Sequence, residues 1–400
     1  MIRSTLSLSF GLATLLMGAA CNRPPAADAD VDEFDTDGTV PEGADVSPSC
    51  GDGIVQEGEF CMVLVDNPGA GIDPCDLDVI DFNHDGRPDL GVPNSDPNIA
   101  NNQYVANIMF GDGSTVGAAA AFEAGGALPV RSAAGDFNGD GHPDFAVSNY
   151  AENAINVLFG DGNGNFERGP QINCPGTSGD LAAGDLDGNG ADELIAVLEG
   201  SSEVKIYFQG QGNGAESLWL DSAPFDVETA DLDDDGRAEL LLPLSDRLEV
   251  YSRLGQEGYL LRWAPPSGFA PTGIKAGDLD DDGDEDVVAI SMGGDVGIYE
   301  FQSNALTFAH AQQFGASFRD LAIADFDHMA RADLALTDTL TNHVLFMRLG
   351  ADDNYYQFAS RFTGSYPVAI VHADFNQDGH QDLATADQFS DRLSIWLNRP

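Results

Sequence analysis

The sequence predicts an all-β fold built from seven similar units, and three observations lead to this prediction. A ten-residue Asp-rich segment recurs seven times at intervals of 46 to 55 residues. Apolar and alternating stretches lie before and after each copy, which is typical of short β-strands. Each interval has room for four strands and their turns. We therefore expect a seven-bladed β-propeller of four-stranded antiparallel blades over residues 76–400.

Each unit follows the same order. A short alternating stretch such as IKAG precedes the Asp-rich segment, an apolar run such as FAV or LLLPL follows it, and a third run such as INVLFG comes next. A fourth, less regular stretch carries aromatic residues, and GDGNGN at 160–165 predicts a tight turn between the third and fourth strands. The seven Asp-rich segments begin at Asp81, Asp136, Asp185, Asp231, Asp278, Asp325 and Asp374.

Closure of the ring can also be predicted. The chain ends at Pro400, just after the third run of the seventh unit, so that unit lacks a fourth strand. A spare candidate, EFCMVLVD at 59–66, lies before the first unit. We expect it to pair with the last blade, because this pairing would leave no open sheet edge.

The Asp-rich segments have the pattern of a cation-binding loop. Positions 1, 3, 5 and 9 carry oxygen-bearing side chains in six of the seven copies, and position 6 is Gly in the same six. Ca²⁺ takes six to eight hard oxygen ligands, and alternate residues of a tight loop can direct several of them at one centre. The predicted ligands are Asp81, Asn83, Asp85, Asp89, Asp136, Asn138, Asp140, Asp144, Asp185, Asp187, Asn189, Glu193, Asp231, Asp233, Asp235, Glu239, Asp278, Asp280, Asp282, Asp286, Asp374, Asn376, Asp378 and Asp382.

The other positions of the loop support this interpretation. Position 7 varies freely, as expected where only its carbonyl oxygen would bind the ion, and Mg²⁺ is less suited because it prefers a strict octahedron. Asp, Asn and Gly are also ordinary turn formers, but six copies with matching positions favour metal binding. The sixth loop has Met329 at position 5 and Ala330 at position 6, so we expect it to be metal-free or weak. Positions 2 and 10 are apolar throughout and predict core anchors.

The repeats resemble the FG-GAP/VCBS family found in integrin-α-type propellers. The resemblance covers roughly residues 60–400 and rests on FGDG at 110–113 and 159–162 together with loops of the DFNGDGHPDF type. It implies a seven-bladed propeller with Ca²⁺ in the loops between the first two strands of each blade. It also implies adhesion or ligand binding through the opposite face. Repeats 3–7 lack the FG element, and repeat 6 lacks the metal pattern.

The first 20 residues read as an export signal. Arg3 precedes an apolar stretch that is short for a membrane span, and small residues stand directly before Cys21. This arrangement resembles a bacterial lipoprotein signal, which implies lipidation of Cys21 and a location at the outer membrane or cell surface. Gly18 stands where that family usually has Leu, and ordinary secretion is the alternative.

Residues 21–49 predict a disordered, acidic tether behind the lipid anchor, since they contain few large apolar side chains. An acidic interaction tail is the alternative reading. The whole chain has a formal net charge of −50, from 17 basic and 67 acidic residues. Such a polyanion is repelled by phosphate backbones and anionic lipids, so we expect no nucleic-acid partner and contact with a membrane through the anchor only. Bound cations would compensate part of the charge.

The cysteines allow more than one pairing. If Cys21 is lipidated, four remain in an exported chain where disulfides persist, and four cysteines have three connectivities. Residues 50–75 form a Cys-containing lead segment before the repeats. Its CGDGIVQEGEFC motif resembles short Cys-rich segments of secreted bacterial proteins, which favours Cys50–Cys61 and leaves Cys75–Cys174.

The sequence carries no recognised catalytic motif: it has no GxSxG, HExxH, P-loop or dinucleotide fingerprint. Of seven His residues, four stand at variable loop positions, which favours a solvated role. We therefore expect a monomeric, non-enzymatic binding module for an extracellular protein or glycan, with structural Ca²⁺. Its contact surface would be the loops between second and third strands and those entering each blade. A lectin or a Ca²⁺-dependent polysaccharide lyase is the alternative.

Overall fold

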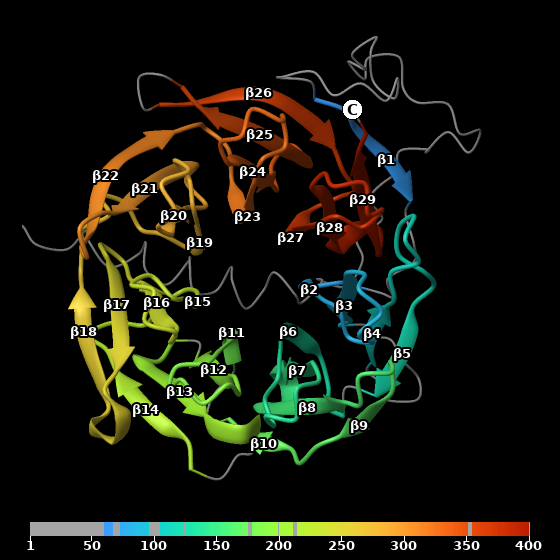
Figure 1. Cartoon of the computed structure of the whole chain (residues 1–400), viewed down its shortest axis with the longest axis vertical. Helices are drawn as coiled ribbons and strands as arrows, with labels where there is room; N and C mark the ends of the chain where they lie inside the picture. Colours follow the sequence, from blue (N-terminus) through green and yellow to red (C-terminus); the bar gives the residue numbers. More distant parts are fainter. Residues whose placement is uncertain are drawn as a thin grey trace, which may run out of the picture.

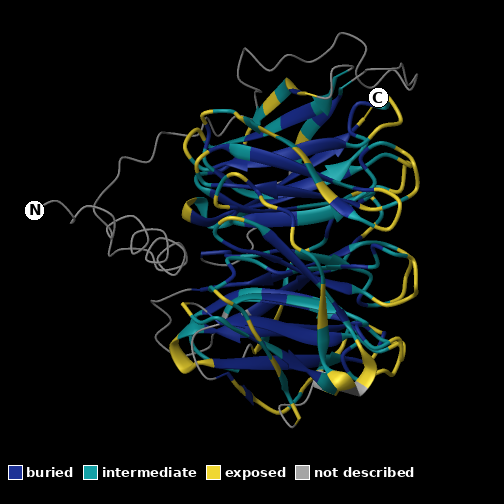
Figure 2. Cartoon of the chain, turned by 90° about the vertical axis from the view of Figure 1, so that its left-hand side faces the viewer, coloured by how far each residue is buried: buried dark blue, intermediate teal, exposed yellow. Residues whose placement is uncertain are grey.

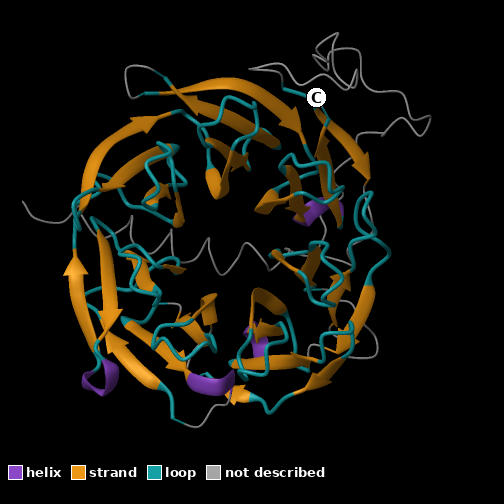
Figure 3. Cartoon of the chain, in the orientation of Figure 1, coloured by secondary structure: helices purple, strands orange, loops and turns teal. Residues whose placement is uncertain are grey.

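The computed structural model describes residues 60–66, 73–95, 105–123, 125–174, 178–198, 200–210, 214–350 and 354–399. Over these residues the chain forms seven antiparallel sheets arranged in a ring around a central axis (Figure 1). The described helices are four short 3-10 turns, and the rest is strand and loop (Figure 3). The predicted seven-bladed β-propeller is confirmed.

The blades follow the chain order, and each is given from its innermost strand outward. Blade 1 is β2 (Asp78–Ile80), β3 (Asp89–Pro93), β4 (Val105–Met109) and β5 (Ala120–Glu123); blade 2 is β6 (Pro129–Gly135), β7 (Asp144–Asn149), β8 (Ala154–Gly160) and an outer strand split into β9 (Phe166–Arg168) and β10 (Ile172–Asn173). Blade 3 is β11 (Ser178–Gly184), β12 (Glu193–Leu198), β13 (Glu203–Tyr207) and β14 (Glu216–Trp219); blade 4 is β15 (Glu228–Ala230), β16 (Glu239–Pro243), β17 (Leu248–Arg253) and β18 (Tyr259–Trp263). Blade 5 is β19 (Gly273–Gly277), β20 (Asp286–Ile290), β21 (Asp295–Phe301) and β22 (Leu306–Gln313); blade 6 is β23 (Phe318–Ala324), β24 (Asp333–Asp338), β25 (His343–Leu349) and β26 (Tyr355–Phe362).

Blade 7 closes the ring with strands from both ends of the propeller. It consists of β27 (Pro367–Ala373), β28 (Asp382–Asp387), β29 (Arg392–Asn398) and, outermost, β1 (Met62–Asp66). β1 pairs antiparallel with β29, with Met62 opposite Asn398 and Leu64 opposite Trp396. The predicted closing strand is confirmed, and the pairing removes the edge that a three-stranded last blade would expose.

The core lies between neighbouring blades, because each sheet buries both of its faces. The second strands are buried along their whole length, whereas exposed residues gather in the loops at the two faces of the ring (Figure 2). The predicted core anchors at loop positions 2 and 10 are at most 2% exposed in every unit. They are Phe82, Phe137, Leu186, Leu232, Leu279, Phe326 and Phe375, and Leu90, Phe145, Leu194, Leu240, Val287, Leu334 and Leu383.

The cysteine prediction is wrong for one pair. Cys75 and Cys174 are buried and form no disulfide, and they lie in different clusters, Cys75 beside Val130 and Cys174 among residues of blades 2 and 3. Each packs as a small apolar side chain, which explains their burial without a bridge. Cys61 is disulfide-bonded, and its partner lies outside the described residues. The Cys50–Cys61 pairing therefore stays a prediction.

The signal at 1–20, Cys21 and the tether at 21–49 also lie outside the described residues. Within the part of the chain that the structure describes, no helix is long and apolar enough to cross a membrane.

Candidate metal centres and an axial pocket

Each Asp loop joins the first and second strands of its blade, so all seven lie on one face of the ring. The position-1 Asp organises every copy. One of its carboxylate oxygens accepts the N–H of position 6 at 2.7–3.1 Å in all seven loops. The other oxygen accepts the N–H of position 4 or 5, as in Asp85 to Asp81 at 3.1 Å. The position-1 carboxylate thus stabilises the turn of its own loop by accepting hydrogen bonds from the loop backbone.

The loop backbone is left-handed twice, at positions 4 and 6. Position 4 has φ between +53° and +75°, a region that Asn, Asp and Gly enter most readily. Position 6 has φ between +82° and +93° in the six glycine loops. Ala330 occupies the same region at +69°, so the sixth loop keeps the shared backbone at the expense of strain.

The position-9 carboxylate anchors the base of the loop. It accepts the N–H of position 2 at 2.9–3.4 Å in every unit. In blades 1 and 2 its second oxygen accepts the N–H of Gly111 or Gly160, the glycines of the two FG elements. A Cβ at Gly160 would lie 2.1 Å from the Pro143 oxygen, so the FG glycine permits a close approach of two backbones.

Burial places these position-9 carboxyls in an unfavourable environment for charge. Burial raises the pKa of Asp144 to about 7 and that of Asp382 to about 7, and the neighbouring Asp378 adds to the second shift. The pKa of Asp333 rises to about 8 by burial and by the Asp327 charge. A cation held in the loop would oppose these shifts by stabilising the ionised form.

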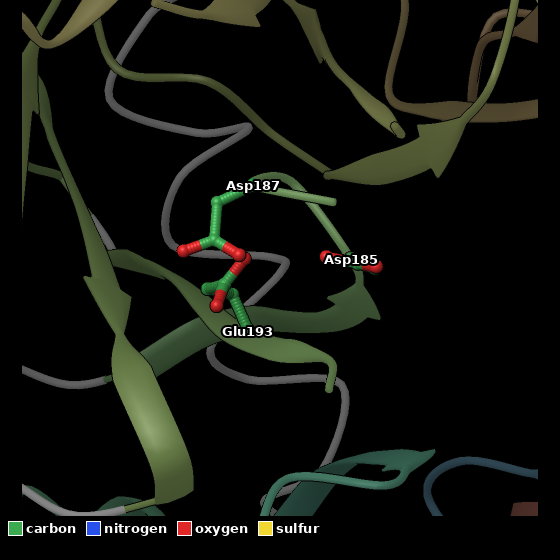
Figure 4. Close-up of side chains that lie close together, drawn as sticks. All are labelled: Asp185, Asp187 and Glu193. Carbon is green, nitrogen blue, oxygen red and sulfur yellow. The ribbon is translucent and has the colours of Figure 1, made fainter. Parts of the chain in front are cut away.

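Four loops bring three carboxylates within 4.8 Å of one another. The groups are Asp185, Asp187 and Glu193; Asp231, Asp233 and Glu239; Asp278, Asp280 and Asp282; and Asp325, Asp327 and Asp333. Figure 4 shows Asp187 and Glu193 turned toward each other beside Asp185. In the first three groups the position-3 Asp has a buried Oδ1 without a hydrogen-bond partner, namely in Asp187, Asp233 and Asp280. Buried unpaired oxygens are costly, and a bound cation would satisfy them.

Arginines contact the other oxygen of several position-3 carboxylates. Arg253 lies 3.2 Å from Asp187 Oδ2, and Arg262 lies 3.0 Å from Asp233 Oδ2. Each arginine offsets part of the loop's charge and leaves Oδ1 for an ion. The loop pattern in the sequence does not point to these arginines, because they stand on strands outside the loops they reach.

The loops at Asp81, Asp136 and Asp374 have Asn at position 3. The side-chain oxygens of Asn83, Asn138 and Asn376 each accept the N–H of position 5 at 2.8–2.9 Å. These loops hold the same backbone with one fewer charge at position 3, and the oxygens of positions 1, 3, 5 and 9 are all present.

The sixth loop differs in its chemistry more than in its shape. Asp325, Asp327 and Asp333 still meet, but Asp327 Oδ2 lies 3.1 Å from Arg348 and its Oδ1 accepts the Met329 N–H. The Arg348 charge therefore lies beside the position-3 carboxylate, and position 5 offers no oxygen. In the other six loops the residues fit a hard cation such as Ca²⁺.

A pocket of about 500 Å³ lies on the axis of the ring, between the first strands. Its lining includes Tyr150, Gly200 and Ser245 from loops that join second and third strands, and Phe225 and Thr272 from connections entering blades. The pocket therefore belongs to the face opposite the Asp loops. On this face Asn94 and Asp387 are buried, whereas Phe389 is exposed and stacks on Tyr366.

Six carboxylates and three basic groups line this pocket, and none of them was predicted from the sequence. They are Asp76, Asp78, Asp180, Asp226, Glu228 and Asp320, and Arg131, Lys275 and Arg319. Four of the acids stand five residues before the first Asp of a loop, so their recurrence can be seen in the sequence. They are Asp76, Asp180, Asp226 and Asp320.

These four acids tie neighbouring blades together. One carboxylate oxygen of each accepts a backbone N–H from the first strand of the next blade or the residue just before it, for example Ile274 to Asp226 at 2.8 Å and Ile370 to Asp320 at 2.8 Å. Lys275 pairs with Glu228 at 2.7 Å across the interface of blades 4 and 5. Burial, followed by the Asp76 charge, raises the pKa of Asp78 to about 7.

Comparisons with known proteins agree with this architecture. Residues 136–196 match the FG-GAP-like repeat family, so the resemblance inferred from the sequence is confirmed for this segment. No match to a curated protein was found.

Solved structures share the fold at low sequence identity. BBS1N, solved in complex with ARL6DN, has a TM-score of 0.56 at 13% identity, covering 86% of this chain and 98% of that one. A protein from Lactobacillus plantarum has a TM-score of 0.55 at 15% identity, covering 76% and 88%. Virginiamycin B lyase from Staphylococcus aureus has a TM-score of 0.54 at 13% identity, covering 84% and 98%.

Proposed function

We propose that this protein is an extracellular ligand-binding module, a propeller whose Asp loops hold structural Ca²⁺ and whose opposite face binds a protein or a glycan. The observation that carries the proposal is the separation of two sites on two faces. Seven acidic loops that share one hydrogen-bond pattern occupy one face, and a polar pocket opens among loops of the other. A ring of this kind keeps its binding face rigid while the ions stabilise the far side.

The Ca²⁺ part of the proposal rests on charge and on unpaired oxygens. The seven loops place 23 acidic side chains at positions 1, 3, 5 and 9. Extracellular Ca²⁺ modules bind at about 10⁻⁴–10⁻³ M, and a tenfold excess of ion stabilises the fold by about 1.4 kcal/mol per site. Six sites would supply several kcal/mol, which is comparable with the stability of a whole domain.

Thermal unfolding with Ca²⁺ and with EDTA tests this part. We expect the midpoint to rise steeply with Ca²⁺ concentration and to rise much less with Mg²⁺. An equal midpoint in Ca²⁺ and in EDTA would refute a structural role for the ion.

The binding part rests on the axial pocket. Its six carboxylates outnumber its three basic groups, which favours a ligand that presents hydrogen-bond donors or a positive charge. Sugar hydroxyls and basic protein side chains both meet this requirement. The chain's own acidity makes an anionic ligand a poor partner.

A glycan array and a panel of cell-surface proteins, probed in Ca²⁺, identify the ligand class. Two matched variants then locate the site: Glu228→Gln in the pocket and Asp234→Asn at an exposed position of an Asp loop. We expect the pocket variant to weaken binding and the loop variant to leave it unchanged. Loss of binding in the loop variant alone would contradict the assignment of faces.

One observation favours the alternative, a carbohydrate-active enzyme. Burial and then the nearby Asp226 carboxylate raise the pKa of Asp180 well above its usual value, and a carboxyl with a raised pKa is a common general acid in glycosidases. Each of these residues, however, already bonds a backbone N–H between blades. We therefore propose no catalysis; product formation from acidic polysaccharides in a lyase assay would overturn this.

The proposal includes export and a lipid anchor at Cys21, supported by the apolar stretch and the small residues before it. Expression in a bacterium with labelled palmitate tests the anchor. We expect label in the wild-type protein and none in Cys21→Ala, with the variant released from the membrane fraction. An unlabelled wild-type chain would support the secreted alternative.

A further inference from the structure

Neighbouring Asp loops contact one another around the face of the ring, and the same two positions recur in these contacts. Position 4 of one loop lies against position 6 or 7 of the next. A Cβ at Gly139 would be 3.2 Å from the Cβ of Ala191, and the Gln377 side chain donates to the Gly86 carbonyl at 2.8 Å. The second of these contacts closes the ring between loops seven and one.

Histidines fill this contact at two of the junctions. His84 at position 4 of the first loop meets His142 at position 7 of the second, with Nε2 and Nδ1 3.0 Å apart. A Cβ at Gly162 would lie 2.4 Å from His142 Nδ1 and 2.7 Å from His84 Cδ2. Gly162 thus allows its backbone to lie directly against the pair, where a larger residue would clash with both rings.

The second pair occupies the equivalent junction between loops six and seven. His328 at position 4 and His380 at position 7 have ring centroids 4.4 Å apart. His328 Nε2 and the Oδ1 atom of Asn398, at the end of β29, are both buried, and the Asn398 side chain interacts with His328. The pairing is therefore repeated at a second, independent place, with an amide side chain beside it.

Imidazole nitrogens select a different class of ion from the carboxylate loops. Zn²⁺ and its neighbours in the first transition row bind His nitrogen at about 2.0–2.1 Å, whereas Ca²⁺ requires oxygen. Two nitrogens bound tetrahedrally to one ion lie roughly 3.3–3.4 Å apart. The His84–His142 separation of 3.0 Å needs to widen by only a few tenths of an ångström.

We propose that these two histidine pairs are transition-metal sites of the Zn²⁺ class, separate from the Ca²⁺ loops. Each ion would link two neighbouring blades, blades 1 and 2 in one case and blades 6 and 7 in the other. The two links flank blades 7 and 1, and blade 7 is where β1 pairs with β29 to close the ring. Solvent or a nearby oxygen completes the coordination of each ion.

Calorimetric titration of the Ca²⁺-saturated protein with ZnCl₂ tests the proposal, since excess Ca²⁺ occupies the carboxylate loops. We expect two Zn²⁺ per chain. His84→Asn, in which Asn tolerates the left-handed backbone, should remove one site, His328→Asn the other, and the double variant both. His142→Gln and His380→Gln remove the second ligand of each pair, at positions whose backbone is not left-handed. Each substitution should weaken Zn²⁺ binding at its site by at least about 10–100-fold. His310→Gln, a histidine on β22, is the matched control and should keep both sites.

Two results would overturn the assignment. Retention of both Zn²⁺ ions in the double variant would place them in the carboxylate loops. No Zn²⁺ binding by the wild-type protein would mean that His84 and His142 only hydrogen-bond to each other and that the rings of His328 and His380 only pack together. Thermal unfolding of each variant in Ca²⁺ alone, with an unchanged midpoint, shows that a lost site reflects a lost ligand rather than a lost fold.

Discussion

Ala330 offers a direct measure of the backbone that the Asp loops require. It has φ of +69° where the other six loops have glycine. The left-handed backbone strains the folded state of an L-residue by about 1–2 kcal/mol. Glycine avoids this strain, but its greater conformational entropy in the unfolded chain lowers the free energy of unfolding by about 0.4–1 kcal/mol. We therefore expect Ala330→Gly to stabilise the protein by about 0.5–1 kcal/mol.

The reverse change is available at the equivalent position of the seventh loop. Gly379 has φ of +91°, and no heavy atom lies within 4 Å of the place where its Cβ would be. Gly379→Ala thus adds backbone strain without a clash, and we expect it to destabilise by a similar amount, about 0.5–1 kcal/mol.

Urea unfolding in EDTA is the appropriate assay, because it removes any contribution from metal binding. The two variants should shift the free energy of unfolding in opposite directions, with unchanged m-values. If Ala330→Gly is neutral or destabilising, or if Gly379→Ala is tolerated, the left-handed backbone at position 6 is not what the loops require.

Three further predictions follow from the site and the pocket. Asp226→Ala should lower the free energy of unfolding by about 1–3 kcal/mol, because it leaves the Ile274 N–H without its acceptor. The exposed control Asp221→Ala should change the free energy of unfolding by no more than about 0.5 kcal/mol in the same urea assay. Equal effects of the two variants would contradict a role of Asp226 in holding the two blades together. The metal-free protein should lose stability as the pH rises from about 4 to 7. Burial raises the folded-state pKa of Asp78 to about 7, so over this range the folded state binds more protons than the unfolded chain. Urea midpoints in EDTA should therefore fall less steeply with pH in Asp78→Asn, and identical slopes in the variant and the wild type would exclude the Asp78 contribution. The double variant Met329→Asp, Arg348→Gln should bind one more Ca²⁺ than the wild type, because it restores the position-5 oxygen and removes the guanidinium beside Asp327. If calorimetry shows no added site, the sixth loop excludes Ca²⁺ for another reason.

The sequence predicted the ring because the signals for it are local and repeated. The apolar residues at positions 2 and 10 mark the core of each blade, as Phe137 and Phe145 show, and the spare strand at 59–66 predicted closure by β1. These features depend on the interval between repeats and on the number of predicted strands, and both can be read directly from the sequence.

The features that sequence reasoning missed depend on contacts between units. Arg262 reaches Asp233 from another strand, and His84 meets His142 across two loops. Pocket acids such as Asp226 recur five residues before the loops, but their role appears only when the next blade lies beside them. The Cys75–Cys174 pairing failed for the same reason, since elimination assumes a proximity that the fold does not provide.

The central claim is that divalent ions occupy the acidic loops, and a crystal structure of the protein grown in Ca²⁺ tests it most directly. We predict six ions, each about 2.3–2.6 Å from the oxygens of positions 1, 3, 5 and 9, and none beside Asp327, whose loop has Met329 at position 5. Density for water alone in the six loops, at saturating Ca²⁺, would contradict the account.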